Sequence, residues 1–288
     1  MRFTKINKSI LKKTHNNYNN ICPDEWVGKI IITGNKVDWQ EKWIKNRNSK
    51  KPDIRRNLNH NNLIGIILES PHNDEFDRYG KALGPARGKT GINLEDYLID
   101  KLEQFQINNN GKIPSGIYKI ILINSIQYKC SLGFKTSVIR DRVWLNTWLN
   151  GGANCFLKRI LNYKPKVVIN LCTMGNHSMD PLYCPNYKIE NISIRYNFLK
   201  NINKKFVQTS EGSIMHKGKR YYYKKYTDID NNSGIKLNKL CYPLTGFVQS
   251  QLFKYKKFIN IYYNKFPIFI RSYHPSSATF ISNSFSNI

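Results

Sequence analysis

Four short apolar runs constrain the fold of this sequence more than any other feature. They lie at residues 63–68 (LIGIIL), 118–123 (YKIILI), 166–171 (KVVINL) and 266–270 (FPIFI). Continuous runs of this length are typical of parallel strands that are buried on both faces. Segments with helical spacing of apolar residues lie between them, at residues 92–105, 137–162 and 244–263. This alternation predicts an α/β fold, a three-layer sandwich around a central four-stranded, mainly parallel sheet.

Two parts of the chain do not fit this core. The first sixty residues lack the alternation, and the stretch at about 178–243 is longer than an ordinary connection between a strand and a helix. We therefore expect a basic N-terminal extension at residues 1–60 and one α/β domain at residues 61–288, with an insertion at about 178–243.

The insertion contains a segment in which groups of basic and aromatic residues are interleaved, at residues 215–226 (MHKGKRYYYKKY). Lys219 and Arg220 would neutralise phosphates there, while Tyr222 would stack on an exposed base. An exposed hairpin with its tyrosines on one face is the alternative.

The charge of the chain is strongly unbalanced. It has 46 Lys and Arg residues against 19 Asp and Glu, a formal net charge of +27. A compact monomer with this imbalance repels itself unless it normally meets a polyanion. A compositional bias toward Lys and Asn explains excess lysine but not the scarcity of acids, so nucleic acid is the expected partner of a monomeric protein.

Cysteine usage and hydropathy bear on the compartment. The six cysteines include no C-x-x-C pair, which argues against a disulfide framework. The first residues lack the apolar stretch of a signal peptide, and no run approaches the roughly 20 apolar residues of a membrane span. We expect a cytoplasmic protein with no membrane association.

Polar motifs follow three of the predicted strands, where α/β sheets bind their ligands. The first strand is followed by Glu69-Ser70-Pro71-His72-Asn73-Asp74-Glu75, and a glycine-rich segment comes soon after it, at residues 84–94 (GPARGKTGINL). The second strand ends at Asn124, and the last is followed by His274-Pro275-Ser276-Ser277. In this order the motifs resemble those of the uracil-DNA glycosylase superfamily, particularly its iron–sulfur branch. There a G-E-A-P-G-x-x-E loop precedes a P-F-x-G-x-x-G-x-x-L segment, and an H-P-S loop follows later.

The resemblance implies a DNA glycosylase, which rotates a base out of DNA and hydrolyses its glycosidic bond to leave an abasic site. It implies that His274 stabilises charge on the leaving base. Glu69 would stabilise the sugar cation and orient water, with Asp74 and Glu75 as less favoured acids. The remaining assignments are base contacts by Asn124, His72, Ala86 and Ser70, backbone contacts by Ser70, Ser276 and Ser277, and a candidate duplex-filling wedge at Phe280. For Phe280 a place in the core is the alternative.

Two departures from the family pattern change the expected substrate. Ser70 stands where many relatives carry Asp or Asn, which shifts water activation to Glu69. Ala86 stands where relatives place an aromatic ring against uracil, and the space it leaves suggests a bulky modified pyrimidine, such as a hypermodified cytosine of phage DNA, and hence antiviral defence. Tyr79 or His72 could supply the ring instead. The alternatives are a uracil-excising repair enzyme and an inactive DNA-binding module of the same fold.

Metal binding and other enzyme classes are less favoured. Cys130 and Cys155 match two cluster ligands of the iron–sulfur relatives, but only Cys22 stands near the N-terminus, and such clusters usually need four thiolates. Cys184 or Cys241 would have to complete the set, so we expect no cofactor. The segment around Lys89 falls one residue short of a P-loop, and no spacing typical of a metal-dependent nuclease occurs.

Overall fold

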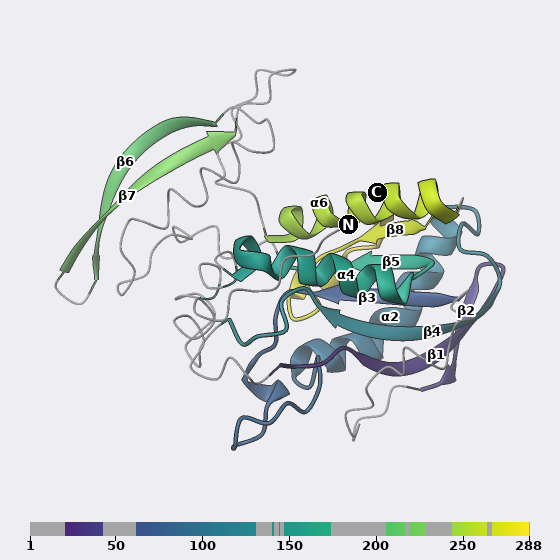
Figure 1. Ribbon diagram of the computed structural model, residues 1–288. Helices are drawn as coiled ribbons and strands as arrows, with labels where there is room; N and C mark the ends of the chain where they lie inside the picture. Colours follow the sequence, from purple (N-terminus) through teal and green to yellow (C-terminus); the bar gives the residue numbers. More distant parts are fainter. Residues whose placement is uncertain are drawn as a thin grey trace.

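A computed structural model describes residues 21–42, 62–130, 140, 144, 147–173, 206–216, 219–228, 244–263 and 267–287, the two strands within 206–228 by their backbone alone. The main body is a seven-stranded sheet in the order β2-β1-β4-β3-β5-β8-β9 (Figure 1). The four strands β4 (Gly116–Asn124), β3 (Leu63–Leu68), β5 (Val167–Asn170) and β8 (Ile268–Arg271) are adjacent and parallel. The strands β1 (Glu25–Thr33), β2 (Lys36–Glu41) and β9 (Ser286–Asn287) pair antiparallel at the two sides. The α/β class is therefore confirmed, but the sheet is mixed and larger than the four-stranded one we expected.

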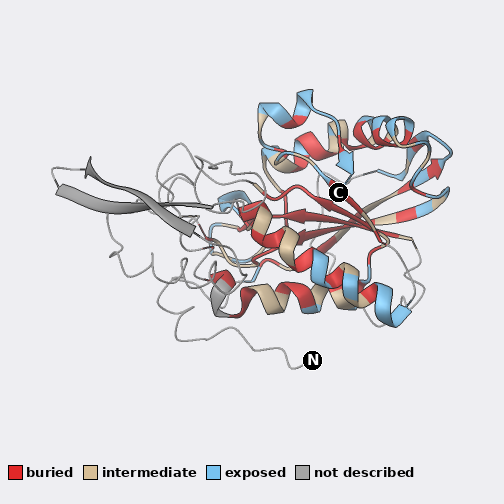
Figure 2. Ribbon diagram, turned by 90° about the horizontal axis from the view of Figure 1, so that it is seen from above, coloured by how far each residue is buried: buried red, intermediate tan, exposed pale blue. Residues whose placement is uncertain are grey.

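Helices cover both faces of the sheet. Alternate residues of a strand face opposite sides, so β3 directs Ile64 and Ile66 toward α2 (Lys89–Asn108) and Ile67 toward α4 (Ala153–Tyr163) and α6 (Leu244–Tyr263). All six residues of β3 are buried, as the continuous apolar run predicted. Figure 2 shows the buried central strands between helices whose outer faces are exposed.

The N-terminal part of the chain corrects one expectation. We placed residues 1–60 outside the core, yet β1 and β2 belong to the main sheet, and Val27, Ile30 and Ile32 are buried in it. The strand was missed because charged and polar positions interrupt its apolar ones and because its partner β4 lies far along the chain. Residues 1–20 and 43–61 lie outside the described part of the chain.

The insertion contributes a second, two-stranded sheet. Its strands β6 (Phe206–His216) and β7 (Lys219–Asp228) pair antiparallel, with Met215 opposite Arg220. Lys219, Arg220 and Tyr222 lie in β7, but their side chains are outside the described structure, as is the rest of the insertion. Within the described residues, no helix has the length and apolar character needed to cross a membrane.

Candidate functional site

A pocket of about 360 Å³ opens at the carboxyl ends of β3, β4 and β8. Its position agrees with the general rule for ligand sites in α/β sheets. The predicted residues that line it are Glu69, Ser70, His72, Asp74, Glu75, Asn124, His274, Ser276 and Ser277. The rest of the lining consists of Leu68, Pro71, Gly88, Lys89, Thr90, Arg140 and Thr173.

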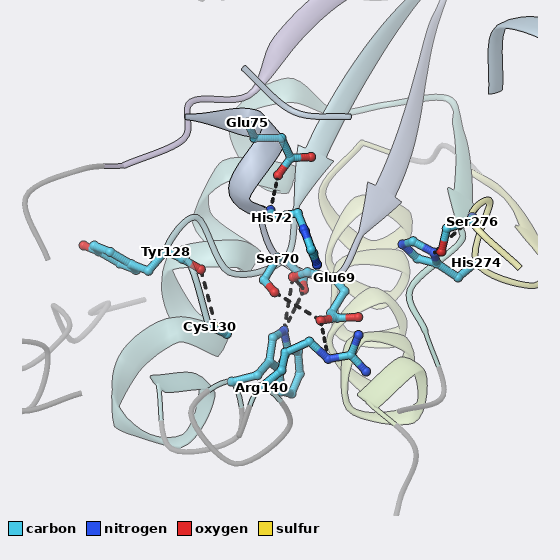
Figure 3. Close-up of polar contacts among 11 residues, drawn as sticks. Glu69, Ser70, His72, Glu75, Tyr128, Cys130, Arg140, His274 and Ser276 are labelled. Atoms are coloured by element: carbon cyan, nitrogen blue, oxygen red, sulfur yellow. Dashed lines mark hydrogen bonds and ion pairs between the residues drawn. The ribbon is translucent and has the colours of Figure 1, made fainter. Parts of the chain in front are cut away.

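Glu69 is held at the floor of this pocket through both its backbone and its side chain. Its carbonyl oxygen accepts hydrogen bonds from the Ile126 amide (3.0 Å), the Trp144 indole (3.1 Å) and the Ser125 hydroxyl. Its side chain is 4% exposed, and Oε1 accepts a hydrogen bond from the Ser70 hydroxyl at 3.1 Å (Figure 3). Ser70 therefore supports Glu69, and the base and phosphate contacts expected of it stay predictions.

Arg140 is the functional residue that sequence reasoning missed. Its Nε lies 2.9 Å from Glu69 Oε1, and both side chains are largely buried (Figure 3). A single arginine in so basic a chain carries no distinguishing signal. The pocket therefore combines a carboxylate with a guanidinium.

The side chain of Glu75 stabilises the loop that follows β3. One carboxylate oxygen accepts the His72 amide and the other accepts the Ala86 amide, each at 2.5 Å. These bonds tie the strand-end loop to the glycine-rich segment. Glu75, one of the two less favoured acids proposed beside Glu69, thus stabilises the loop through hydrogen bonds to the backbone.

The glycines of the second motif make room for neighbouring groups. A Cβ on Gly88 would lie 2.3 Å from Asp74 Oδ2, so the Asp74 carboxylate sits against the start of α2, where a negative charge is favoured. A Cβ on Gly91 would lie 2.0 Å from the carbonyl oxygen of Ala86. Ala86 itself has a positive φ of 53° and is 3% exposed. The motif therefore fixes the geometry of the loop that leads into α2.

Ala86 does not belong to the pocket lining, contrary to our expectation. Its side chain packs into the apolar cluster between α2 and the sheet. Of the two rings considered as replacements, His72 lines the pocket, whereas Tyr79 is 77% exposed and contacts Arg78.

Asn124 reaches the pocket from the end of β4 and is 1% exposed. Its Nδ2 donates to Cys22 Sγ at 3.7 Å, while its buried Oδ1 has no hydrogen-bond partner among the described residues. An unsatisfied buried acceptor is costly, so this oxygen is suited to a ligand that brings a donor.

A buried ion pair fixes the backbone beside Asn124 from outside the pocket. Arg159 of α4 pairs with Asp24, which precedes β1, at 2.5 Å. The same guanidinium donates to the carbonyl oxygens of Asn124 (2.7 Å) and Ser125 (3.1 Å).

His274 faces the pocket from the loop after β8. Its Nδ1 lies 2.8 Å from the Ser276 hydroxyl and accepts the Ser276 amide at 3.3 Å, so the proton of the neutral ring is on Nε2. Figure 3 shows this second nitrogen on the side that faces His72. Burial lowers the pKa of His274 to about 3, and the charges of Arg140 and His72 act in the same direction. The ring is thus a neutral hydrogen-bond donor near pH 7.

Two residues after His274, Ser277 and Phe280, have structural roles. Ser277 caps the short helix α7 (Ala278–Ser282), its hydroxyl accepting the Phe280 amide at 3.2 Å. Phe280 is fully buried against Phe285 and Lys101. A wedge must be exposed to enter a duplex, so the burial of Phe280 favours the core residue over the wedge.

No disulfide joins the cysteines in the described part of the chain. Cys22 and Cys130 are fully buried and Cys155 is partly exposed, while Cys184 and Cys241 lie outside the described residues. Burial and the acids Glu75 and Asp24 raise the pKa of Cys22 well above its usual value, which disfavours a thiolate ligand. Where the structure describes the chain, no three His, Cys, Asp or Glu side chains gather closely enough to hold a metal ion.

The fold and the site define an α/β protein with a pocket at the carboxyl edge of its sheet. The pocket offers a paired carboxylate, an amide acceptor and a neutral imidazole donor. No protein-family model matches the sequence, and neither the curated proteins nor the solved structures provide a match.

Proposed function

We propose that the chain is a divergent member of the uracil-DNA glycosylase superfamily that hydrolyses the glycosidic bond of a base rotated out of DNA. The observation that carries this proposal is the convergence of Glu69, Asn124 and His274 on one pocket, although they come from distant parts of the sequence. These are the three residues to which the resemblance assigns the chemistry. The net charge of +27 supports DNA as the partner.

The pocket chemistry suits cleavage of a nucleoside. As the bond between C1′ and the base lengthens, positive charge develops on the sugar and negative charge on the base. The buried Glu69 carboxylate would stabilise the sugar cation and accept a proton from the attacking water. His274 Nε2–H would donate a hydrogen bond to an oxygen of the departing base, as donors in an oxyanion hole do. Water supplies the new C1′–O bond, and the base leaves with the electron pair of the broken bond.

Asn124 would recognise the base. Its Oδ1, which is unpaired among the described residues, would accept a hydrogen bond from a ring N–H or an amino group of the base. The Nε2–H of His274 would donate to an acceptor on the same base. A pyrimidine carries both kinds of group on its edge, which supports a pyrimidine as the target.

We propose a bulky modified pyrimidine, such as a hypermodified cytosine of phage DNA, as the preferred base, with a role in antiviral defence. The pocket volume of about 360 Å³ falls within the range of cavities that hold ligands larger than a single small ring. Uracil excision is the second candidate, and the ring of His72 in the pocket wall favours it, because that ring could stack on an unmodified base.

Mass spectrometry of bases released from a panel of DNAs tests the proposal. The panel should contain uracil, cytosine, hydroxymethylcytosine and glucosylated hydroxymethylcytosine, and abasic sites should be scored by alkaline strand cleavage. We expect release of a modified pyrimidine that is lost in Glu69→Gln and His274→Ala, with Glu41→Gln as an exposed control. Release of uracil alone would support the repair function. DNA binding without any released base would identify an inactive module.

A further inference from the structure

The loop that carries His274 is a tight turn fixed by a residue of α2. The Ser277 amide donates to the His274 carbonyl oxygen at 3.0 Å, which closes a turn with Pro275 and Ser276 at its two central positions. Proline at the first central position presets the backbone for such a turn. Ser276 is not among the described non-glycine residues with a positive φ, which agrees with a type I turn.

The central peptide of this turn has a partner on each side. On one side, the Pro275 carbonyl oxygen accepts a hydrogen bond from Asn93 Nδ2 at 2.5 Å. On the other side, the Ser276 amide donates to His274 Nδ1 at 3.3 Å. A trans peptide is planar, and its C=O and N–H point in opposite directions. Fixing the carbonyl therefore fixes the direction of the amide.

We infer that Asn93 is a positioning residue for His274, acting through the planar peptide between Pro275 and Ser276. The inference rests on the role proposed above for His274. Asn93 is 7% exposed and comes from the first part of α2, so its amide is held by the helix. The side-chain amide of Asn93 fixes the peptide between Pro275 and Ser276. The Ser276 N–H of this peptide donates to Nδ1 of His274 and keeps it an acceptor. The Nε2–H of the same ring is thereby directed to the pocket.

A matched control lies on the same helix. Gln106 is also a buried amide of α2 that donates to backbone carbonyls, those of Gly34 (2.9 Å) and Ile113 (2.8 Å), but at the end away from the pocket. Asn93→Leu and Gln106→Leu each remove a buried donor while keeping a side chain of similar size. Only the first removes a contact to the His274 turn.

The readout is the titration of the His274 ring, followed by NMR and assigned by comparison with a His274→Gln variant. The charged groups that face the pocket with His274 are His72, Lys89, Arg140 and the acids Glu69, Asp74 and Glu75. In the unmodified protein we expect His274 to remain neutral between about pH 4 and 8. In Asn93→Leu we expect its midpoint to rise by at least about one pH unit, because the ring is no longer held in its enclosed position. Gln106→Leu should leave the midpoint unchanged.

Asn93→Asp provides a second test that does not depend on Asn93→Leu being folded. When ionised, the carboxylate introduced by this substitution presents an acceptor to the Pro275 carbonyl, whereas its protonated form can donate to it. The His274 environment should therefore be disturbed at neutral pH and recover as the pH falls. An unchanged ring titration in both Asn93 variants, or an equal shift in Gln106→Leu, would overturn the inference.

Kinetics separate this inference from the proposed function. If the protein releases a base, kcat should fall by about 10- to 100-fold in Asn93→Leu while KM stays within about threefold. If the unmodified protein releases no base, the proposed function fails. The NMR titration still decides whether Asn93 positions His274.

Discussion

Arg140 Nε lies 2.9 Å from Glu69 Oε1, and this ion pair is enclosed, with 13% and 4% of the two side chains exposed. A second ion pair, between Lys29 and Glu41, is exposed at 40% and 49%. Because the enclosed pair sits in the pocket and the exposed pair does not, the two allow a direct comparison of charge removal inside and outside the site.

Arg140→Gln should destabilise the protein far more than Lys29→Gln. Breaking a buried pair costs about 3–5 kcal/mol, whereas an exposed pair contributes at most about 1 kcal/mol. Urea denaturation of both variants measures the difference in the free energy of unfolding. Arg140→Gln should also raise the pKa of His274, since a charge that lowers it is gone. Equal stability losses in the two variants would contradict the importance of the enclosed pair.

Stability should fall in acid because of His274. Its pKa is about 3 in the folded protein against 6.5 in a free side chain, so the unfolded chain binds the proton more readily between these values. The contribution of His274 to the free energy of unfolding should therefore be fully present above about pH 6.5 and decline as the pH drops toward 3, by at most about 5 kcal/mol. Denaturation at a series of pH values measures this slope. His274→Gln should flatten it; a slope unchanged in that variant would assign the effect to other groups.

Gly88→Ala should disturb the pocket through Asp74. The added Cβ would meet Asp74 Oδ2, the end of a side chain that can turn aside, so we expect a loss of no more than about 1 kcal/mol in the free energy of unfolding. Asp74→Ala in the same chain should restore most of it, because the carboxylate that clashes is gone. Gly91→Ala is the control: its Cβ would meet the Ala86 carbonyl oxygen, so Asp74→Ala should not rescue it. Denaturation of the single and double variants gives the free energies of unfolding for this double-mutant cycle.

Phe280→Ala should act on stability and not on DNA contact. The ring is fully buried, so its removal should cost about 3–5 kcal/mol. Binding to single-stranded and duplex DNA, measured below the melting temperature of the variant, should be unchanged. A selective loss of duplex binding would restore the wedge assignment.

The framework of the fold was readable from the sequence, because it depends on local patterns. The run at 63–68 coincides with β3, and the helical spacing at 244–263 coincides with α6. β1 could not be read in this way, since its burial depends on pairing with β4 far along the chain.

The site was predictable only in part. Glu69, Asn124 and His274 stand at strand ends, where a strand pattern locates them. Arg140 and Asn93 are recognisable only by their spatial partners, Glu69 and Pro275. Ala86 was misplaced, and Phe280 stayed undecided between wedge and core, because a motif gives the order of residues but not the face of the backbone on which each side chain lies.

The contact between Asp24 and Arg159 makes the pocket depend on a part of the chain that does not line it. Arg159 holds the carbonyl oxygens of Asn124 and Ser125 and is itself held by a carboxylate at the start of the first strand. A chain shortened past Asp24 would retain every residue of the pocket lining. The Arg159 guanidinium, which holds the carbonyl oxygens of Asn124 and Ser125, would nevertheless lose its carboxylate partner. Asp24 is therefore a remote determinant of the site, although it does not line the pocket.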